Sequence, residues 1–173
     1  MLDRVDPPLA QDKSEILECS VNGCHTRLAI EPGASLLEAL RNGLGLTGSR
    51  FGCGLEQCGA CMVLVDGRPR PACQLFAPDV NGRQVITIEG LHKDAAGQDL
   101  LAAFLQHQAG QCGYCLSGIV VTAFAWLRDL QHMPNRAEIA AALDPHLCRC
   151  GAQPRILAAI EAAAKQRLAG GLA

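Results

Sequence analysis

The chain has 173 residues, of which 49% are hydrophobic and only 3% are aromatic, and its formal net charge is −2 at pH 7. This length allows one domain or two small ones, and the charge, without any run of Lys or Arg, argues against a nucleic-acid partner. No stretch approaches the roughly 18 consecutive apolar residues of a membrane span.

Residues 1–14 lack the basic start, apolar centre and cleavage site of a secretory signal. We therefore expect a cytoplasmic protein, although a partner could bring it to the membrane or export it. In a reducing compartment, ten cysteines favour metal ligation over disulfides.

The first predicted element is a hairpin. Residues 16–30 alternate in polarity on either side of Asn22-Gly23, a pair typical of a type I′ turn. Cys19 and Cys24 fall on the apolar face of this hairpin. We interpret both as small buried hydrophobic residues rather than ligands.

A helix and a second hairpin are expected next. The helix begins at Ser35, where Glu38 completes a capping box. A hairpin about Asp66-Gly67 and a short strand over residues 84–88 then complete a small sheet with a helix across it.

Residues 43–48, Gly-Leu-Gly-Leu-Thr-Gly, match the string G-x-G-x-x-G of dinucleotide sites. Such a site needs the string after a strand and at the start of a helix. Here the string follows the predicted helix and leads into a cysteine-rich loop. We interpret it as a helix stop and turn, so no NAD or FAD site is expected.

From about residue 91 the pattern becomes helical, and four helices imply a small bundle. They are predicted over residues 99–107 and 117–130, from Asn135, and from Pro154 to about Leu168. We therefore expect an α+β protein with two domains, residues 15–90 and residues 91–168.

The first cysteine set has the spacing C-x4-C-x2-C, followed after eleven residues by a fourth cysteine. Its first three positions match the plant-type ferredoxin loop. Gly52, Gly54 and Gly59 stand beside them, where side chains would block backbone amides from bridging sulfides. Zinc sites favour paired C-x2-C knuckles, so the spacing favours a [2Fe–2S] cluster over zinc or buried structural thiols. The four residues are Cys53, Cys58, Cys61 and Cys73.

The second set is a C-x2-C separated by 32 residues from a C-x-C. This spacing alone leaves a four-cysteine zinc site open. However, both halves precede predicted helices, whose N-termini offer free amides and positive dipole ends to an anionic cluster. The four residues are Cys112, Cys115, Cys148 and Cys150.

Other candidate chemistry is sparse. The five histidines are scattered, and His146, close to the second set, is interpreted as a turn residue. We find no candidate nucleophile, general base or open metal position, so no catalytic residue is assigned to this chain.

Three runs, Gly52–Cys61 (GCGLEQCGAC), Gln111–Cys115 (QCGYC) and Cys148–Gly151 (CRCG), resemble the small iron–sulfur subunit of xanthine-dehydrogenase-type molybdenum hydroxylases. The form of the first run is closest to the isoquinoline 1-oxidoreductase and nicotinate dehydrogenase branch. The resemblance covers nearly the whole chain. It implies a β-grasp plant-type ferredoxin domain followed by a four-helix domain, each with one [2Fe–2S] cluster held by the cysteines above.

The resemblance also implies a function. Gln111 and Cys150 would contact a molybdopterin, in its cytosine dinucleotide form, on a large partner subunit. Electrons would pass through a buried second set and leave through an exposed first set to an acceptor such as a cytochrome. The implied substrate is an N-heteroaromatic compound such as nicotinate or isoquinoline. The alternatives are the small subunit of an aldehyde-oxidising molybdoenzyme, a free two-cluster ferredoxin and a zinc-stabilised interaction module.

Overall fold

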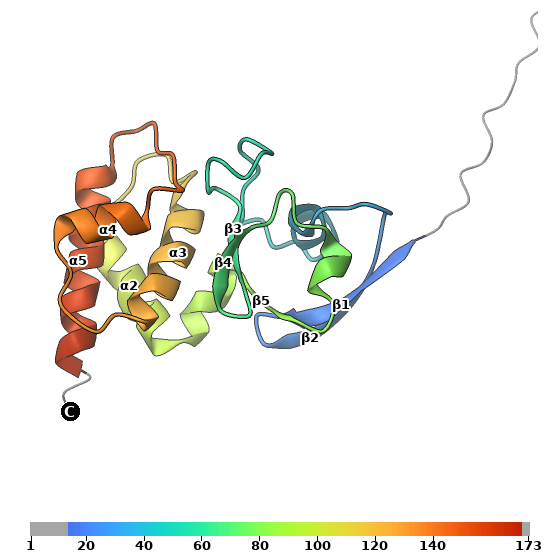
Figure 1. Cartoon of the computed structure of the whole chain (residues 1–173), viewed down its shortest axis with the longest axis horizontal. Coiled ribbons are helices and arrows are strands. Elements are labelled where there is room, and N and C mark those ends of the chain that lie inside the picture. Colours follow the sequence, from blue (N-terminus) through green and yellow to red (C-terminus); the bar gives the residue numbers. More distant parts are fainter. Residues whose placement is uncertain (1–13, 171–173) are drawn as a thin grey trace, which may run out of the picture.

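The computed structural model describes residues 14–170, which form a sheet part and a helical part side by side (Figure 1). The predicted α+β class is confirmed. The strands are β1 (Glu15–Val21), β2 (Cys24–Ile30), β3 (Met62–Val65), β4 (Arg68–Pro71) and β5 (Gln84–Ile86). The α-helices are α1 (Leu36–Glu38), α2 (Ala95–Gln106), α3 (Leu116–Arg128), α4 (Arg136–Ala142) and α5 (Gln153–Gly170).

The five strands make one mixed sheet in the order β2-β1-β5-β3-β4. Strands β1 and β5 are parallel and the other neighbours are antiparallel. Both predicted hairpins are confirmed, because Asn22 and Gly23, like Asp66 and Gly67, have the positive φ angles that a type I′ turn requires.

The two cysteines of the first hairpin differ in burial. Cys19 on β1 is buried as predicted, but Cys24 is exposed, so that part of the prediction is wrong. Cys24 pairs with Val21 beside the turn, on a strand that forms the edge of the sheet. Its face was identified correctly, but the apolar core does not extend to this corner.

The helix across the sheet begins as predicted. The Ser35 hydroxyl accepts a hydrogen bond from the Glu38 N–H at 3.2 Å, and the Glu38 carboxylate accepts one from the Ser35 N–H at 2.8 Å. The helix widens into a π-helical turn over Ala39–Gly43. The glycine-rich string therefore follows a helix, as expected.

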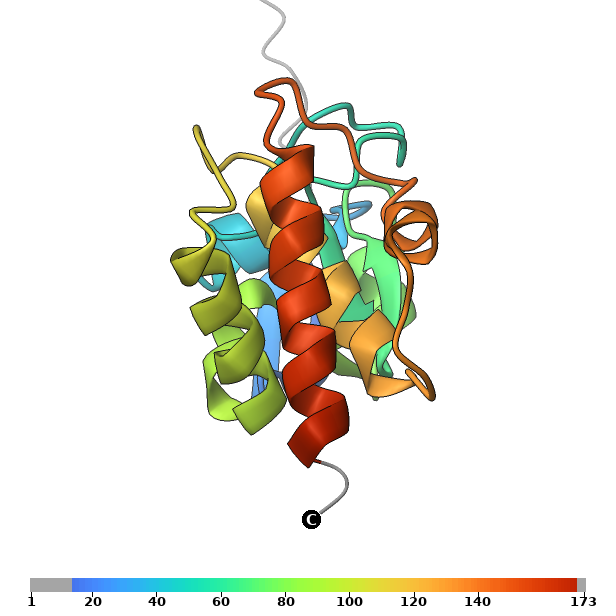
Figure 2. The same ribbon diagram turned by 90° about the vertical axis from the view of Figure 1, so that its left-hand side faces the viewer.

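In the helical part, α5 packs against α2 and α4, and α3 packs against the sheet (Figure 2). Helix α2 begins four residues earlier than predicted, because the Asp94 carboxylate caps it by accepting from the N–H groups of Ala96 and Gly97. Glycine is a poor helix former, so Gly97 did not indicate a helix start. Glycine is nevertheless required at this position, since a Cβ would lie 2.2 Å from the Leu91 carbonyl oxygen. In residues 14–170 we find no helix with the length and apolarity to cross a membrane.

Strand β3 joins the two parts because it is buried on both faces. Met62 and Leu64 belong to the core shared with the helices, whereas Val63 and Val65 belong to the core under the sheet. The predicted domain boundary at residue 90 falls in a 3₁₀ turn, Ile88–Lys93. That boundary stays a prediction.

Candidate metal centres

Three loops that carry all the predicted ligand cysteines except Cys73 lie at one edge of the molecule, the upper edge in Figure 1. They are the loop before β3, the loop between α2 and α3 and the loop between α4 and α5. Direct hydrogen bonds connect them, including one from the Leu147 N–H to the Cys58 carbonyl at 3.1 Å. The fold therefore brings both predicted sets together along a single surface.

The first loop turns its backbone N–H groups toward sulfur. Cys53 Sγ accepts hydrogen bonds from the N–H groups of Leu55 at 3.3 Å and Gln57 at 3.2 Å. Cys58 Sγ accepts one from the Cys53 N–H at 3.3 Å. A Cβ on Gly52 would lie 2.5 Å from Cys58 Sγ. This glycine is therefore needed beside Cys58, while its predicted role of opening the loop to bridging sulfides stays a prediction.

The thiols of the first set form two pairs. The Leu55 N–H is the main reason that the pKa of Cys53 is lowered to about 7, and a hydrogen bond with Cys58 contributes. Burial raises the pKa of Cys61 to about 12, and its thiol is hydrogen-bonded to Cys73. Both Cys61 and Cys73 are buried. The buried Cys61 thiol, with its raised pKa, ionises readily only when a cation neutralises it.

The second set is also arranged in pairs. Cys150 Sγ lies 3.4 Å from Cys112 Sγ, and the thiols of Cys115 and Cys148 are hydrogen-bonded. The Tyr114 N–H, 3.5 Å from Cys112 Sγ, is the main reason that the pKa of Cys112 is lowered. Burial raises the pKa of Cys115 to about 12.

Two helices begin beside the second set, as predicted. Cys115 is the N-cap residue of α3, and Cys148 and Cys150 shortly precede α5. Burial opposes ionisation of Cys148, but hydrogen bonds from the Ala152 N–H and from Cys115 lower its pKa overall. These local donors favour a thiolate.

This arrangement fits a [2Fe–2S] cluster. Such a cluster takes four cysteine thiolates, two on each iron, and both sets consist of two pairs. Tetrahedral zinc instead needs its ligands around one point.

The two sets are more alike in exposure than we expected. Cys115 is buried, but Cys112 is exposed in this chain, so the expectation of a buried second set is wrong for the chain by itself. Gln111 is exposed beside Cys112. The second set therefore reaches the surface at Gln111 and Cys112.

His146 makes a contact with the first cysteine loop that the sequence did not indicate. It lies in a turn, as predicted, but its side chain is half-buried between the two cysteine loops. Its Nε2 is 2.8 Å from the Thr122 hydroxyl, and a Cβ on Gly59 would lie 2.2 Å from its Nδ1. Burial lowers its pKa to about 4. A lone histidine in a loop gives no periodic signal that would have revealed this contact.

A second missed contact involves Arg50 and Tyr114. The Arg50 guanidinium lies 5.3 Å from the centroid of the Tyr114 ring, and it contributes to the lowered pKa of Cys112. The Tyr114 hydroxyl donates a hydrogen bond to the Phe51 carbonyl. Residues adjoining the first set therefore touch the second.

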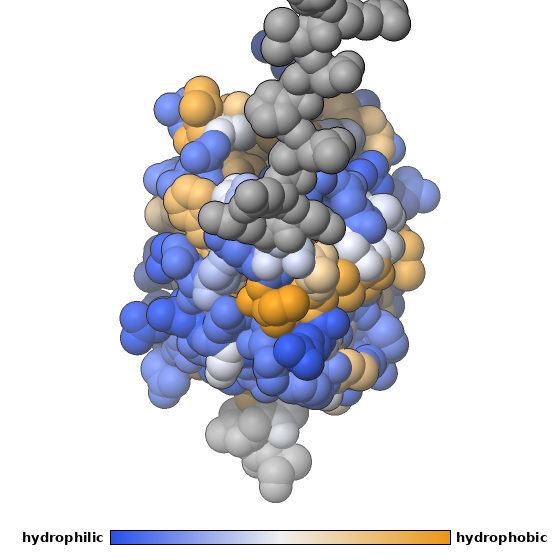
Figure 3. Space-filling model, turned by 90° about the vertical axis from the view of Figure 1, so that its right-hand side faces the viewer, coloured by the Kyte–Doolittle hydropathy of each residue, from blue (hydrophilic) through white to orange (hydrophobic). Residues whose placement is uncertain are grey.

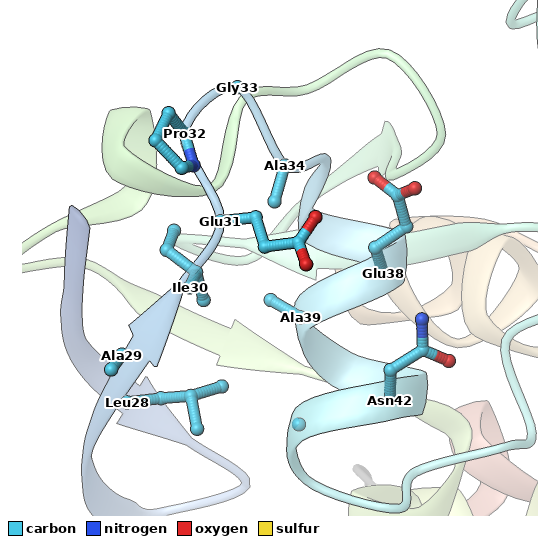
Figure 4. Close-up of a pocket in the computed structure, with 11 residues that line it drawn as sticks. Leu28, Ala29, Ile30, Glu31, Pro32, Gly33, Ala34, Glu38, Ala39 and Asn42 are labelled. Atoms are coloured by element: carbon cyan, nitrogen blue, oxygen red, sulfur yellow. The ribbon is translucent and has the colours of Figure 1, made fainter. Parts of the chain in front are cut away.

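Two of the hollows that lie outside the cysteine sets differ in their lining. One, of about 700 Å³, is an apolar groove beside Gly110 and Gly113, where Leu105 is 79% exposed. The other, of about 420 Å³, lies between β2 and α1, and its lining contains neither cysteine nor histidine (Figure 4). The Glu38 carboxylate at its rim already serves the capping box. The sheet end of the molecule is largely hydrophilic, with a hydrophobic patch near its centre (Figure 3).

Comparisons with known proteins agree with this geometry. Residues 19–87 match the family model of a 2Fe-2S iron-sulfur cluster binding domain, and residues 87–161 match that of a [2Fe-2S] binding domain. A nicotinate dehydrogenase subunit from Pseudomonas putida is 40% identical, over 87% of this chain and 96% of that protein. The aldehyde oxidoreductase iron-sulfur-binding subunit PaoA of Escherichia coli O157:H7 is also 40% identical, over 91% of this chain and 76% of that protein.

A solved structure shows the same fold. In quinoline 2-oxidoreductase from Pseudomonas putida 86, one chain superposes with a TM-score of 0.84 and 33% identity. The match covers 91% of this chain and 98% of that one. The predicted order, a β-grasp ferredoxin domain followed by a helical [2Fe–2S] domain, is confirmed.

Proposed function

This chain belongs to the family of small iron–sulfur subunits of xanthine-dehydrogenase-type molybdenum hydroxylases, and from that premise we propose how its residues carry electrons. The chain is an electron-transfer subunit of an oxidoreductase. We propose that the set containing Cys53 and the set containing Cys112 each ligate one [2Fe–2S] cluster. When bound, a [2Fe–2S] cluster takes up and releases one electron at a time.

The observation that carries this proposal is the pairing of the thiols. Cys112 and Cys150, with sulfurs 3.4 Å apart, would hold one iron, and Cys115 and Cys148 would hold the other. The first set offers the same arrangement. Backbone N–H groups aimed at Cys53 Sγ would stabilise negative charge there, as hydrogen bonds to cluster sulfurs do.

The direction of transfer is proposed from the surface beside the second set. Gln111 and Cys112 are exposed, and the apolar groove with Leu105 lies next to them. Exposed apolar surface of this kind is typical of a protein interface. The large subunit would dock here, with Gln111 and Cys150 contacting its molybdopterin in the cytosine dinucleotide form.

We further propose an N-heteroaromatic substrate for the assembled enzyme, such as nicotinate or isoquinoline, and a cytochrome or similar protein as the acceptor at the first set. The names of the nicotinate and quinoline relatives support this substrate class. A cytoplasmic location is proposed, with association at the membrane through a partner as the alternative.

An aldehyde substrate is the second candidate, because PaoA matches this chain with the same identity as the nicotinate relative. The purified complex can be assayed with nicotinate, isoquinoline and an aromatic aldehyde under identical conditions. Turnover of the aldehyde alone would replace the proposed substrate class without changing the role of this chain.

The proposal for the clusters is tested on the complex purified with its partner. We expect molybdenum, iron and acid-labile sulfide, and two distinct [2Fe–2S] signals in low-temperature electron paramagnetic resonance (EPR) of the reduced enzyme. A lone monomer without molybdenum would instead indicate a free two-cluster ferredoxin. Bound zinc without either signal would indicate a zinc-stabilised module.

The role of Gln111 has its own test. Gln111→Ala should lower the molybdenum content of the purified complex while both EPR signals remain, because only the pterin contact is lost. Gln106→Ala, an exposed glutamine at the end of α2, is the control. Unchanged molybdenum content and activity in Gln111→Ala would remove the assigned role.

A further inference from the structure

Arg50 precedes the first cysteine set, but its side chain lies over the loop of the second. Its guanidinium is 5.3 Å from the centroid of the Tyr114 ring, within the range of a cation–π interaction. Tyr114 lies between Cys112 and Cys115, and its N–H donates to Cys112 Sγ at 3.5 Å. The positive charge of Arg50, a residue of the sheet part, thus lies over Tyr114, which stands between two predicted ligands of the helical part.

The backbone on both sides of Arg50 is held in place. Its N–H donates to the Ala60 carbonyl at 3.0 Å, and the carbonyl before it accepts from Arg41 at 2.8 Å. The carbonyl after it, that of Phe51, accepts from the Tyr114 hydroxyl. The ion pairs found within residues 14–170 all involve other cations. The position of this charge is therefore set by the fold rather than by a carboxylate.

We propose that Arg50 is a positioning residue that raises the reduction potential of the second cluster, an inference that rests on the proposed function. Uptake of one electron adds one negative charge at the second cysteine set. A cation close to that set stabilises the reduced form more than the oxidised form. Electrons arriving from the partner subunit are thereby held more favourably at the second set.

The selectivity of the effect distinguishes it from a general structural role. The Arg50 guanidinium stacks on Tyr114 in the loop of the second set, whereas the hydrogen bond from Arg50 to the first loop is made by its backbone N–H. Loss of the Arg50 charge should therefore lower the reduction potential of the second cluster more than that of the first. Because Arg50 is exposed in this chain, a shift measured at high salt should be smaller wherever solvent reaches the site.

The test is a redox titration of the purified complex, followed by EPR, for three variants. Arg50→Gln removes the charge, Arg50→Lys keeps it, and Tyr114→Phe keeps the ring and its N–H but loses the hydroxyl. In Arg50→Gln we expect a lower midpoint potential for the second cluster. At a given potential, the ratio of oxidised to reduced second cluster should rise roughly three- to tenfold. A tenfold rise corresponds to a midpoint potential lowered by about 59 mV for one electron. The other two variants should stay near the wild type.

Several results would overturn the proposal. They are an unchanged second potential in Arg50→Gln, an equal shift at both clusters, and the same shift in Arg50→Lys. The signal that disappears in Cys115→Ser identifies the second cluster, and iron content is measured for each variant. If Arg50→Gln does not assemble, Tyr114→Leu removes the ring beneath the guanidinium and should lower the same potential; no change there also overturns the proposal. Two [2Fe–2S] signals in the wild-type complex would uphold the proposed function whatever the Arg50 variants do.

Discussion

The contact between α3 and the first cysteine loop should not tolerate even one added methyl group. Gly118 lies in the first turn of α3, and a Cβ there would be 1.9 Å from the Gly59 carbonyl oxygen. Ordinary contact begins at 3.4 Å, so Gly118→Ala requires about 1.5 Å of movement, the difference between these two values. The nearest obstacle is backbone rather than a flexible side chain. The helix and the cysteine loop must therefore move apart.

Overpacking of this kind costs roughly 1–3 kcal/mol, while alanine in a helix gains up to about 1 kcal/mol over glycine. With the full alanine gain, we expect a net loss of up to about 2 kcal/mol, and each kcal/mol lowers the melting temperature by roughly 2–4 °C at this size. Thermal unfolding of the cluster-loaded chain measures it. Gly170→Ala is the matched control, because Gly170 is also helical and has nothing within 4 Å of an added Cβ. The reasoning fails if Gly118→Ala unfolds at or above the temperature of Gly170→Ala.

Two further predictions concern the metal site and a helix cap. Cys115→Ser should remove the EPR signal of the second cluster and stop electron delivery to the acceptor. The control Cys24→Ser, at an exposed thiol outside both sets, should keep both signals. Full activity with both clusters in Cys115→Ser would refute the ligand assignment. Glu38→Gln should destabilise the chain at neutral pH, because the Ser35 N–H and hydroxyl lower the pKa of Glu38 in the folded state. That stability is present above the unfolded-state pKa and is lost as the pH falls through the folded-state pKa. Denaturant unfolding should therefore show the variant approaching the wild type in acid, and a difference that stays constant with pH would contradict this account.

The features that could be predicted from the sequence are those that short-range signals determine. Asn22-Gly23 encodes its turn because both residues accept a positive φ. Ser35 and Glu38 encode a helix start through hydrogen bonds three residues apart. The C-x4-C-x2-C spacing and the contact of Gly52 with Cys58 also lie within one short segment. For these elements, the chain needs no distant contact to specify the conformation.

The contacts between the two cysteine loops could not be predicted in the same way. Leu147 donates to the carbonyl of Cys58, and His146 packs against Gly59, although both partners are far away in the sequence. Such contacts follow from how the helical part docks on the sheet. The exposure of Cys24 likewise depended on where the core ends, because hairpin periodicity identifies a face but not its depth.

The relative position of the two cysteine sets is therefore fixed mainly by the core between the sheet and the helices. Strand β3 begins directly after Cys61 and sends Met62 and Leu64 into the helical core. Helix α3 begins directly after Cys115 and packs on that strand. In each set, one predicted ligand, Cys61 or Cys115, thus directly precedes a buried element. The loops themselves are free to adopt unfavourable backbone angles, such as the positive φ of Glu56, because buried packing rather than the loop conformation holds the two sets in register.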